Sequence, residues 1–268
     1  MAPLNAPAQP ARGGEFTHQG YADLLAAFGR QGYAFHAFSA AERLLDGGEP
    51  FVLLRHDLDM SLERALPIAR LDAAAGVRST FFVMLRTEHY NPLSAAGDAL
   101  IRQILGLGHQ LGLHFDARAY PELAGAPEDA HVAALIQRLC AREAEILEQW
   151  FGVSVPVVSF HQPNPLALAG APELTAPRLH TYMALFNRRM AYYADSTGRW
   201  RFGHPLGSEA FAQRRPMQLL IHPIWWNETP LSPARALDDF VEERIACLDE
   251  SLALNCKSYE RRGAPKES

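Results

Sequence analysis

The chain has 268 residues, of which 48% are hydrophobic and 21% charged, and its formal net charge is −5. This length suits one large α/β domain, and the hydrophobic fraction supports a real core, which argues against wholesale disorder. Lys and Arg are adjacent in pairs at most, as at Arg261 and Arg262 in the tail, and form no longer cluster. Nucleic acids are bound largely through clustered basic residues, so we expect no nucleic-acid partner.

The cysteines and the chain ends carry little information about function. The three cysteines are odd in number and far apart, which predicts neither a disulfide framework nor a paired-cysteine metal site. No apolar run approaches the length of a membrane span. Residues 1–16 are expected to be a flexible leader without signal-peptide features, and residues 261–268 a flexible tail. A cytoplasmic protein is the simplest expectation.

Periodicity and turn residues predict the elements in chain order. Residues 17–48 are expected to form two short helices, because apolar side chains recur at helical spacing there. Strands and helices then alternate: strand 51–54, helix 61–75, strand 79–85, helix 94–107, strand 110–115, helix 128–151 and strand 155–160. After a less periodic stretch over 163–189 come strands near 190–194 and 217–221 and a closing helix from Ser232 to about Leu254.

This alternation implies parallel strands joined by right-handed crossovers, in a barrel or an open sheet. No repeat or internal linker divides the chain. We therefore expect residues 17–260 to form a single domain with a helical N-terminal extension.

Residues capable of chemistry follow the apolar strands at their C-terminal ends. They are Asp57 and Asp59, His114, His161, Asp195 and His222. In (β/α) barrels the loops after these strand ends build the active site. We therefore expect the side chains to converge on one mouth of the fold.

Asp57 and Asp59 are two residues apart, so in an extended segment their carboxylates point to the same side. Two carboxylates so close repel each other, and a divalent cation beside them relieves that repulsion. The alternative is that Asp59 only caps the helix expected to start near Ser61.

The three strand-end histidines each allow a functional and a structural interpretation. One Asp with two His is an ordinary ligand set for zinc and related divalent ions, which makes His114 a candidate ligand. His161 could be a ligand or could hydrogen-bond the ligands or the substrate. His222 could be a general acid, or its ring could only bond a neighbouring carbonyl.

Trp225 and Trp226 directly follow the last strand. Aromatic rings offer apolar area with a polar edge, so the pair could form a platform for a sugar face. They could equally bury the end of the barrel.

Taken together, these motifs resemble the polysaccharide-deacetylase superfamily with its NodB homology domain, over about residues 51–226. The likeness is greatest to a divergent branch associated with bacterial surface-polysaccharide gene clusters, including O-antigen biosynthesis. It rests on Arg55-His-Asp-Leu-Asp59 with Thr80-Phe-Phe82, on Gly108-His-Gln-Leu-Gly-Leu-His114, on Ser159-Phe-His-Gln-Pro163, on Tyr193-Ala-Asp-Ser196 with Trp200-Arg201, and on Leu220-Ile-His-Pro-Ile-Trp-Trp226.

The resemblance implies an α/β fold, a distorted (β/α)7 barrel of the NodB type, and hydrolysis with one divalent metal. Zinc is the first expectation for that metal, with iron, manganese and cobalt as alternatives. Carried over by motif, the general base is Asp57, the general acid is His222, and two metal ligands are Asp59 and His114.

The sequence departs from the family pattern at three places. Arg118 stands where the second metal histidine is usual, His161 replaces the arginine of the middle motif, and Arg55 with His56 begins the first motif. We hypothesise that His161 supplies the missing ligand and that Arg55 orients Asp57.

The expected activity is removal of an N-acyl group, acetyl or formyl, from an amino sugar in bacterial surface-polysaccharide biosynthesis. The sugar could be a small molecule or be linked to a nucleotide or a lipid. Asp195, Trp225 and Trp226 are expected to bind it. Two alternatives are a C–N hydrolase acting on a non-sugar imide or ureide, and a carbohydrate-binding barrel without turnover.

Overall fold

A computed structural model of the protein describes residues 16–261. The expected flexible leader, apart from Phe16, and the expected tail, apart from Arg261, lie outside the described residues. Two compact units divide the chain, one ending at Pro230 and the other starting at Leu231. The single domain over residues 17–260 stays a prediction. Within residues 16–261, no helix combines the length and the apolar character needed to cross a membrane.

The first unit alternates strands with helices. Its strands are β1 (Ala34–Phe35), β2 (Phe51–Leu58), β3 (Thr80–Val83), β4 (Gln110–Phe115), β5 (Val157–Phe160), β6 (Leu179–His180), β7 (Ala191–Ala194) and β8 (Met217–Ile221). Its α-helices are α1 (His18–Arg30), α2 (Ala41–Gly47), α3 (Ala65–Ala74), α4 (Ala95–Gly106), α5 (Ala130–Phe151), α6 (Pro165–Ala169), α7 (Ala184–Arg189) and α8 (Glu209–Ala212). The second unit contains α9 (Pro233–Asn255).

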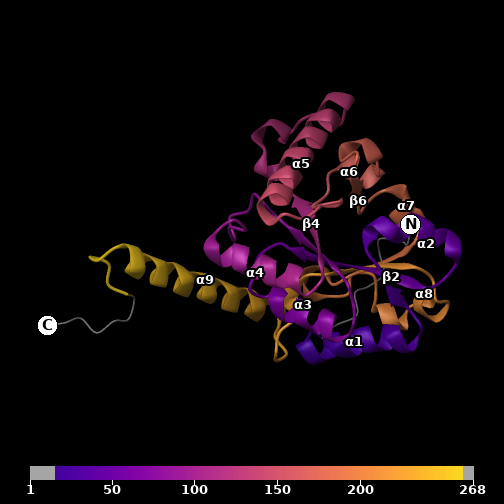
Figure 1. The fold of residues 1–268 in the computed structure, drawn as a ribbon, viewed down its shortest axis with the longest axis horizontal. Helices are drawn as coiled ribbons and strands as arrows, with labels where there is room; N and C mark the ends of the chain where they lie inside the picture. Colours follow the sequence, from indigo (N-terminus) through magenta and orange to yellow (C-terminus); the bar gives the residue numbers. More distant parts are fainter. Residues whose placement is uncertain (1–15, 262–268) are drawn as a thin grey trace. The chain divides into compact units, whose positions relative to one another are not determined.

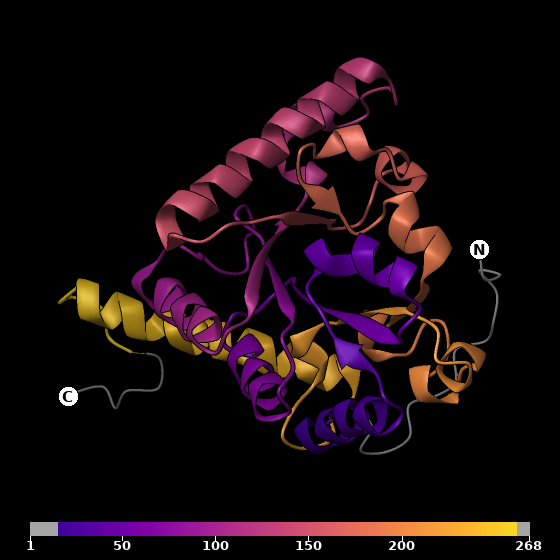
Figure 2. The ribbon, with the colours of Figure 1, turned by 45° about the vertical axis from the view of Figure 1, so that its right-hand side comes forward.

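All strand pairs are parallel, in the order β6-β5-β4-β3-β2-β8-β7, with β1 beside the start of β2. Within the described residues no pairing joins β6 to β7, so the curled sheet is an incompletely closed barrel. Helices α1, α3, α4 and α5 lie around the outside of the strands (Figures 1 and 2). The predicted distorted (β/α) barrel is confirmed.

Strand β2 is twice as long as the sequence predicted, and this extension forms one side of the site. Arg55, His56 and Asp57 continue the strand, because their backbones pair with β3, and Arg55 and His56 also pair with β8. All eight residues of β2 are buried. Charged side chains rarely continue a buried strand unless they are paired, which these are, as described below.

Two short strands, β1 and β6, were not predicted, because two residues show no periodicity. Helix α3 begins at Ala65, four residues later than expected. Ser61 instead makes a turn in which its hydroxyl accepts the Arg64 N–H at 3.2 Å. Asp59 therefore does not cap α3, which was the alternative role expected for it.

A glycine on β4 leaves room for an aromatic side chain of the neighbouring strand. A Cβ added at Gly112 would stand 2.6 Å from the Phe82 ring on β3, closer than such atoms approach in real structures. Only glycine therefore fits two positions before His114 on this strand.

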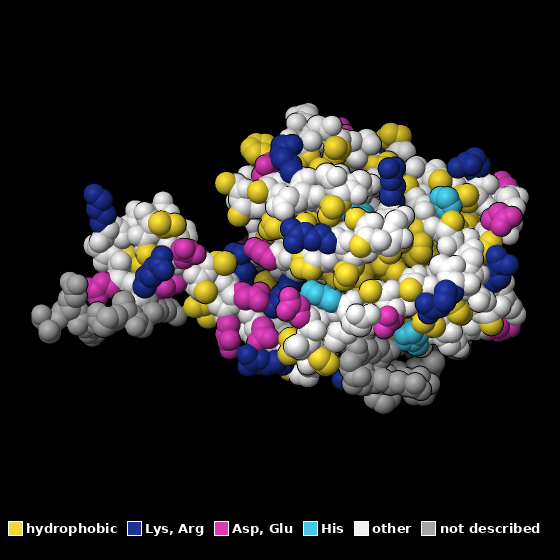
Figure 3. All heavy atoms as spheres, turned by 60° about the horizontal axis from the view of Figure 1, so that its bottom comes forward, with side chains coloured by type: hydrophobic (Ala, Val, Ile, Leu, Met, Phe, Trp, Pro, Cys, Tyr) yellow, Lys and Arg dark blue, Asp and Glu magenta, His cyan; other side chains and the backbone are white. Residues whose placement is uncertain are grey.

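On the face that Figure 3 shows, acidic and basic side chains are interspersed, without a basic patch.

A buried carboxyl group on α5 gives the fold a pH dependence. Glu143 is 3% exposed and accepts a hydrogen bond from the Tyr120 hydroxyl. Burial raises the pKa of Glu143 to about 7, from an ordinary value of 4.5. Stability from a raised pKa is complete below the ordinary value and is lost as pH rises through the folded value.

We therefore expect Glu143→Gln to raise the free energy of unfolding at about pH 8 by about 1–3 kcal/mol and to change it little at about pH 4. Glutamine keeps an oxygen to accept the Tyr120 hydroxyl and removes the cost of burying a charge. Urea unfolding at both pH values measures the difference, with the exposed Glu145→Gln as control. Equal effects of Glu143→Gln at both pH values would contradict the assignment.

Candidate active site

The site begins with a buried ion pair on β2. The Arg55 guanidinium holds Asp57 through two hydrogen bonds, Nη2 to Oδ2 at 2.6 Å and Nε to Oδ1 at 3.1 Å. Nη2 also donates to Ser159 Oγ at 2.6 Å, and Nη1 donates to Gln218 Oε1 at 3.3 Å. Both charged side chains are almost fully buried. This geometry fits the hypothesis that Arg55 orients Asp57.

Ser159 and Gln218 were not predicted as residues of the site, although the sequence contains a signal for each. Ser159 is on β5, two residues before His161, which directly follows the end of this strand. The two side chains therefore face the same side of the sheet. Gln218 is a lone polar residue inside the apolar strand Met217–Ile221. A polar side chain in a buried strand requires a partner, and that partner is Arg55.

The same pairing sets the charge of Asp57. Burial raises the pKa of this carboxyl group, but the opposing charges of Arg55 and His114 outweigh burial, and the pKa is lowered. Asp57 therefore stays ionised at neutral pH. Its lowered pKa stabilises the fold above the ordinary aspartate value, and this contribution is lost as pH falls towards the folded value.

Replacing Arg55 with Met should lower the free energy of unfolding by about 3–5 kcal/mol, because Asp57 would remain as an unpaired buried charge. The double variant Arg55→Met/Asp57→Asn should recover much of this loss, since it removes the orphaned charge as well. Urea unfolding at neutral pH compares the two. If the double variant were no more stable than the single one, the pair would not be the source of the effect.

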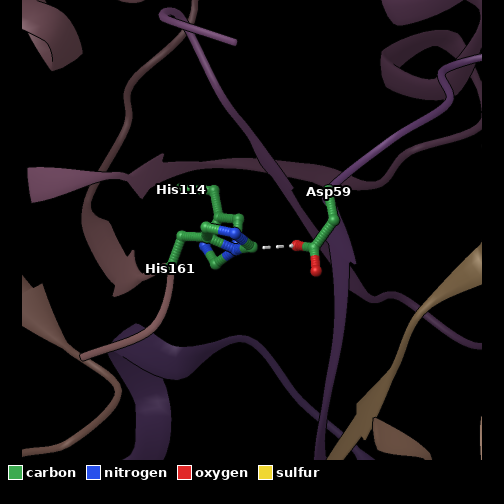
Figure 4. Close-up of side chains that lie close together, drawn as sticks. All are labelled: Asp59, His114 and His161. Carbon is green, nitrogen blue, oxygen red and sulfur yellow. Dashed lines mark hydrogen bonds and ion pairs between the residues drawn. The ribbon is translucent and has the colours of Figure 1, made fainter. Parts of the chain in front are cut away.

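Next to this pair, three potential metal ligands come together from three strand ends (Figure 4). His114 Nε2 lies 2.9 Å from Asp59 Oδ1, and His161 Nδ1 lies 3.3 Å from the same oxygen. The two ring nitrogens are 3.2 Å apart. These are the three residues that the sequence proposed as ligands.

The donor atoms fit one divalent ion. Ligands held about 2.0–2.1 Å from a tetrahedral ion stand about 3.3 Å apart, close to the three separations observed. One carboxylate oxygen and two imidazole nitrogens that face a common point suit zinc and similar ions. The residues present therefore fit a bound metal, although their role as ligands stays a prediction.

The electrostatics of this cluster favour a cation. Burial raises the pKa of Asp59, but hydrogen bonds from His114 and His161 and the charge of His222 hold that pKa well below its usual range. Burial lowers the pKa of His161, but the hydrogen bond and charge of Asp59 outweigh it, so that pKa is raised. The cluster thus keeps an anionic carboxylate at its centre at neutral pH.

On the other side of Asp59, His222 is fixed by a buried carboxylate. His222 Nδ1–H donates to Asp195 Oδ1 at 2.6 Å, and the His222 backbone N–H lies 3.0 and 2.9 Å from the two Asp195 oxygens. The Trp226 indole N–H donates to Asp195 Oδ2 at 2.7 Å. Nε2 of His222 consequently faces the site, 3.8 Å from Asp59 Oδ2.

This arrangement keeps His222 protonated at neutral pH. Burial lowers the pKa of its ring, but the charge and hydrogen bond of Asp195, with the charges of Asp59 and Asp57, raise it to about 9. His222 therefore does not fit the structural alternative of a ring bonded to a backbone carbonyl. Its partner is a carboxylate.

The residues expected to bind substrate lie deeper than the sequence suggested. Asp195 is fully buried, and its oxygens are engaged by His222 and Trp226. Trp226 is 1% exposed and packs against the rings of Phe16 and Tyr21, and Trp225 is 8% exposed. For the tryptophans the structure favours the alternative that they bury the end of the barrel. A substrate contact at these three residues stays a prediction.

Arg118 does not replace the missing ligand. Its guanidinium forms a two-point pair with Asp116, with Nη2 at 2.8 Å from Oδ2, and donates through Nη1 to Gln162 Oε1 at 2.8 Å. The side chain is about half exposed at the rim. The ring of His161 faces Asp59, whereas the side chain of Arg118 pairs with Asp116. This arrangement fits the hypothesis that His161 takes the place of the missing histidine ligand.

No protein-family profile and no curated protein matches the chain. Among solved structures it is similar to the Streptococcus pyogenes deacetylase PplD in complex with acetate, at 14% identity and a TM-score of 0.47, over 89% of this chain and 92% of that one. The chitin deacetylase from the fungal pathogen Colletotrichum lindemuthianum aligns at 17% identity and a TM-score of 0.41, over 73% and 83% of the two chains. IcaB from Ammonifex degensii aligns at 19% identity and a TM-score of 0.43, over 62% and 73%. Identities and TM-scores are low in all three, so the activity has to be inferred from the site.

Proposed function

We propose that this chain is a metal-dependent amide hydrolase that removes an acetyl or formyl group from an amino sugar used in bacterial surface-polysaccharide biosynthesis. One observation supports it most. Asp59, His114 and His161 offer three ligand atoms within 4.8 Å of one another, between an ionised Asp57 and a protonated His222. A hydrolase of amides needs a base for water and an acid for the leaving amine, and in this proposal Asp57 and His222 supply them.

Asp59, His114 and His161 would hold the ion in this proposal. Such a metal, when bound, polarises the acyl carbonyl and lowers the pKa of a bound water. The chain's contribution is to keep Asp59 ionised and to aim two imidazole nitrogens at the same point.

Asp57 is the proposed general base. The Asp57 Oδ2 atom is 3.7 Å from His114 Nε2, so this carboxylate lies beside the ligand cluster. Water would attack the acyl carbon while Asp57 Oδ2 or Oδ1 takes the water's proton. Arg55 keeps this carboxylate ionised and fixed before the reaction, which removes the need for reorganisation.

His222 is the proposed general acid. When the C–N bond breaks, the nitrogen takes a proton from His222 Nε2 and leaves as a neutral amine. An amine is a poor leaving group without that proton. Asp195 holds the opposite ring nitrogen, which leaves Nε2–H as the only ring proton that faces the site.

The test is a panel of N-acetyl and N-formyl amino sugars, free and nucleotide-linked, with released amine measured by a fluorogenic reagent. The protein is stripped with a chelator and then reloaded with zinc, cobalt, manganese or iron(II). Activity that requires added metal and disappears in Asp57→Asn supports the proposal. Activity on imides or ureides alone, or sugar binding with no release of amine by any metal form, would contradict it.

A further inference from the structure

Helix α9 presents an apolar stripe that nothing in its own unit covers. Eight large hydrophobic side chains are exposed among the described residues, and five of them are on this helix. They are Val241 (53% exposed), Ile245 (45%), Leu248 (62%), Leu252 (39%) and Leu254 (77%). Isolated exposed apolar residues are ordinary, but a contiguous apolar stripe marks an interaction surface.

The spacing of this stripe is that of a coiled-coil seam. Val241, Ile245, Leu248 and Leu252 follow one another at intervals of four, three and four residues. Side chains repeating every 3.5 residues on average remain on one line only when two helices wind around each other. Leu254 lies outside this line.

We propose that α9 is a self-association helix, which pairs in parallel with α9 of a second copy of this chain through Val241, Ile245, Leu248 and Leu252. An isoleucine at the first core position of the heptad with a leucine at the second favours two-stranded assemblies, and Ile245 with Leu248 has that arrangement. This inference is independent of the proposed catalytic activity.

Charges beside the stripe complement a parallel partner. Arg244 directly precedes Ile245 and Asp249 directly follows Leu248. In a parallel pair, a residue at Arg244's position faces the position five residues later on the other helix, which is occupied by Asp249 of the partner subunit. An antiparallel pair would instead bring Glu242 near Asp249 of the partner subunit, and two carboxylates repel.

The stripe is short, so the association should be weak. From Val241 to Leu252 the helix rises by about 17 Å, less than two full heptads. We expect dimerisation in the micromolar range, which makes the dimer fraction depend on protein concentration.

Sedimentation velocity of the full chain between about 1 and about 500 µM tests this. Wild type should pass from monomer to dimer with rising concentration, and Leu248→Glu should weaken dimerisation at least about 10-fold. Leu254→Glu is the matched control, because it changes an exposed leucine of the same helix outside the stripe, and it should leave dimerisation unchanged. Wild type that stays monomeric, or a dimer indifferent to Leu248→Glu, would overturn the proposal.

A charge exchange tests the parallel orientation. Arg244→Glu should weaken the dimer several-fold, and Arg244→Glu/Asp249→Arg should restore it, because the pair is exchanged and not lost. Tyr259 donates a hydrogen bond to Asp249 at 2.6 Å within the unit, so Tyr259→Phe controls for the loss of that bond. A double variant no better than Arg244→Glu would rule out the parallel arrangement. Circular dichroism of each variant checks that α9 remains helical.

Discussion

His161→Ala is expected to purify with less than about a tenth of the metal bound by wild type, and to lose about 10³-fold or more of its amide hydrolysis. The substitution removes Nδ1, which lies 3.3 Å from Asp59 Oδ1 and 3.2 Å from His114 Nε2. Two donors would remain on the protein, and a catalytic metal site normally has three. The site would therefore bind its metal much more weakly.

Elemental analysis after gentle purification, followed by competition with a chromogenic chelator, measures this loss. His131→Ala is the matched control, because it removes an exposed histidine of α5 and should change neither metal content nor activity. Thermal unfolding of metal-stripped protein separates metal loss from misfolding. One equivalent of tightly held metal in His161→Ala would show that this histidine serves another purpose, such as a substrate contact.

Much of the site could be predicted because polar residues are rare in buried parallel strands. Asp57, His114 and His161 each stand in or directly after an apolar run, and parallel strands bring such ends to one edge. The period of two in an extended segment also placed Asp57 and Asp59 on one side. These inferences need only strand direction and periodicity, both of which the sequence shows.

Other features depend on contacts that sequence periodicity does not describe. The hydrogen bond between Asp195 and His222 was not predicted. It exists because β7 and β8 are neighbours in the sheet, and this adjacency brings the Asp195 carboxylate to His222, 27 residues away. The extent of β2 depends on pairing partners for Arg55, one of which, Gln218, is on β8. Likewise, periodicity predicted α9 as a helix but not the exposure of its apolar stripe, because a buried and an exposed stripe look alike in sequence.

The geometry at Asp195 predicts the second large effect. Asp195→Asn should lower kcat/KM for an N-acetyl amino sugar by about 10²–10⁴-fold, the usual contribution of general acid catalysis. Asparagine is of similar size, but it removes the charge that raises the pKa of His222 to about 9. The ring would then lose its proton at lower pH, so the alkaline limb of the pH–rate profile should shift to lower pH.

An ester substrate separates this role from general damage to the site. 4-Nitrophenyl acetate releases 4-nitrophenolate, which departs without being protonated. If His222 acts as the acid, the kcat/KM of Asp195→Asn for this ester should therefore stay within about 10-fold of wild type. Trp226→Phe removes a different hydrogen bond, the one to Asp195 Oδ2, and leaves the carboxylate charge in place. It should therefore reduce amide hydrolysis far less than Asp195→Asn does. Equal losses on amide and ester would instead mean that Asp195 supports the base or the ligand cluster, and that another group protonates the amine.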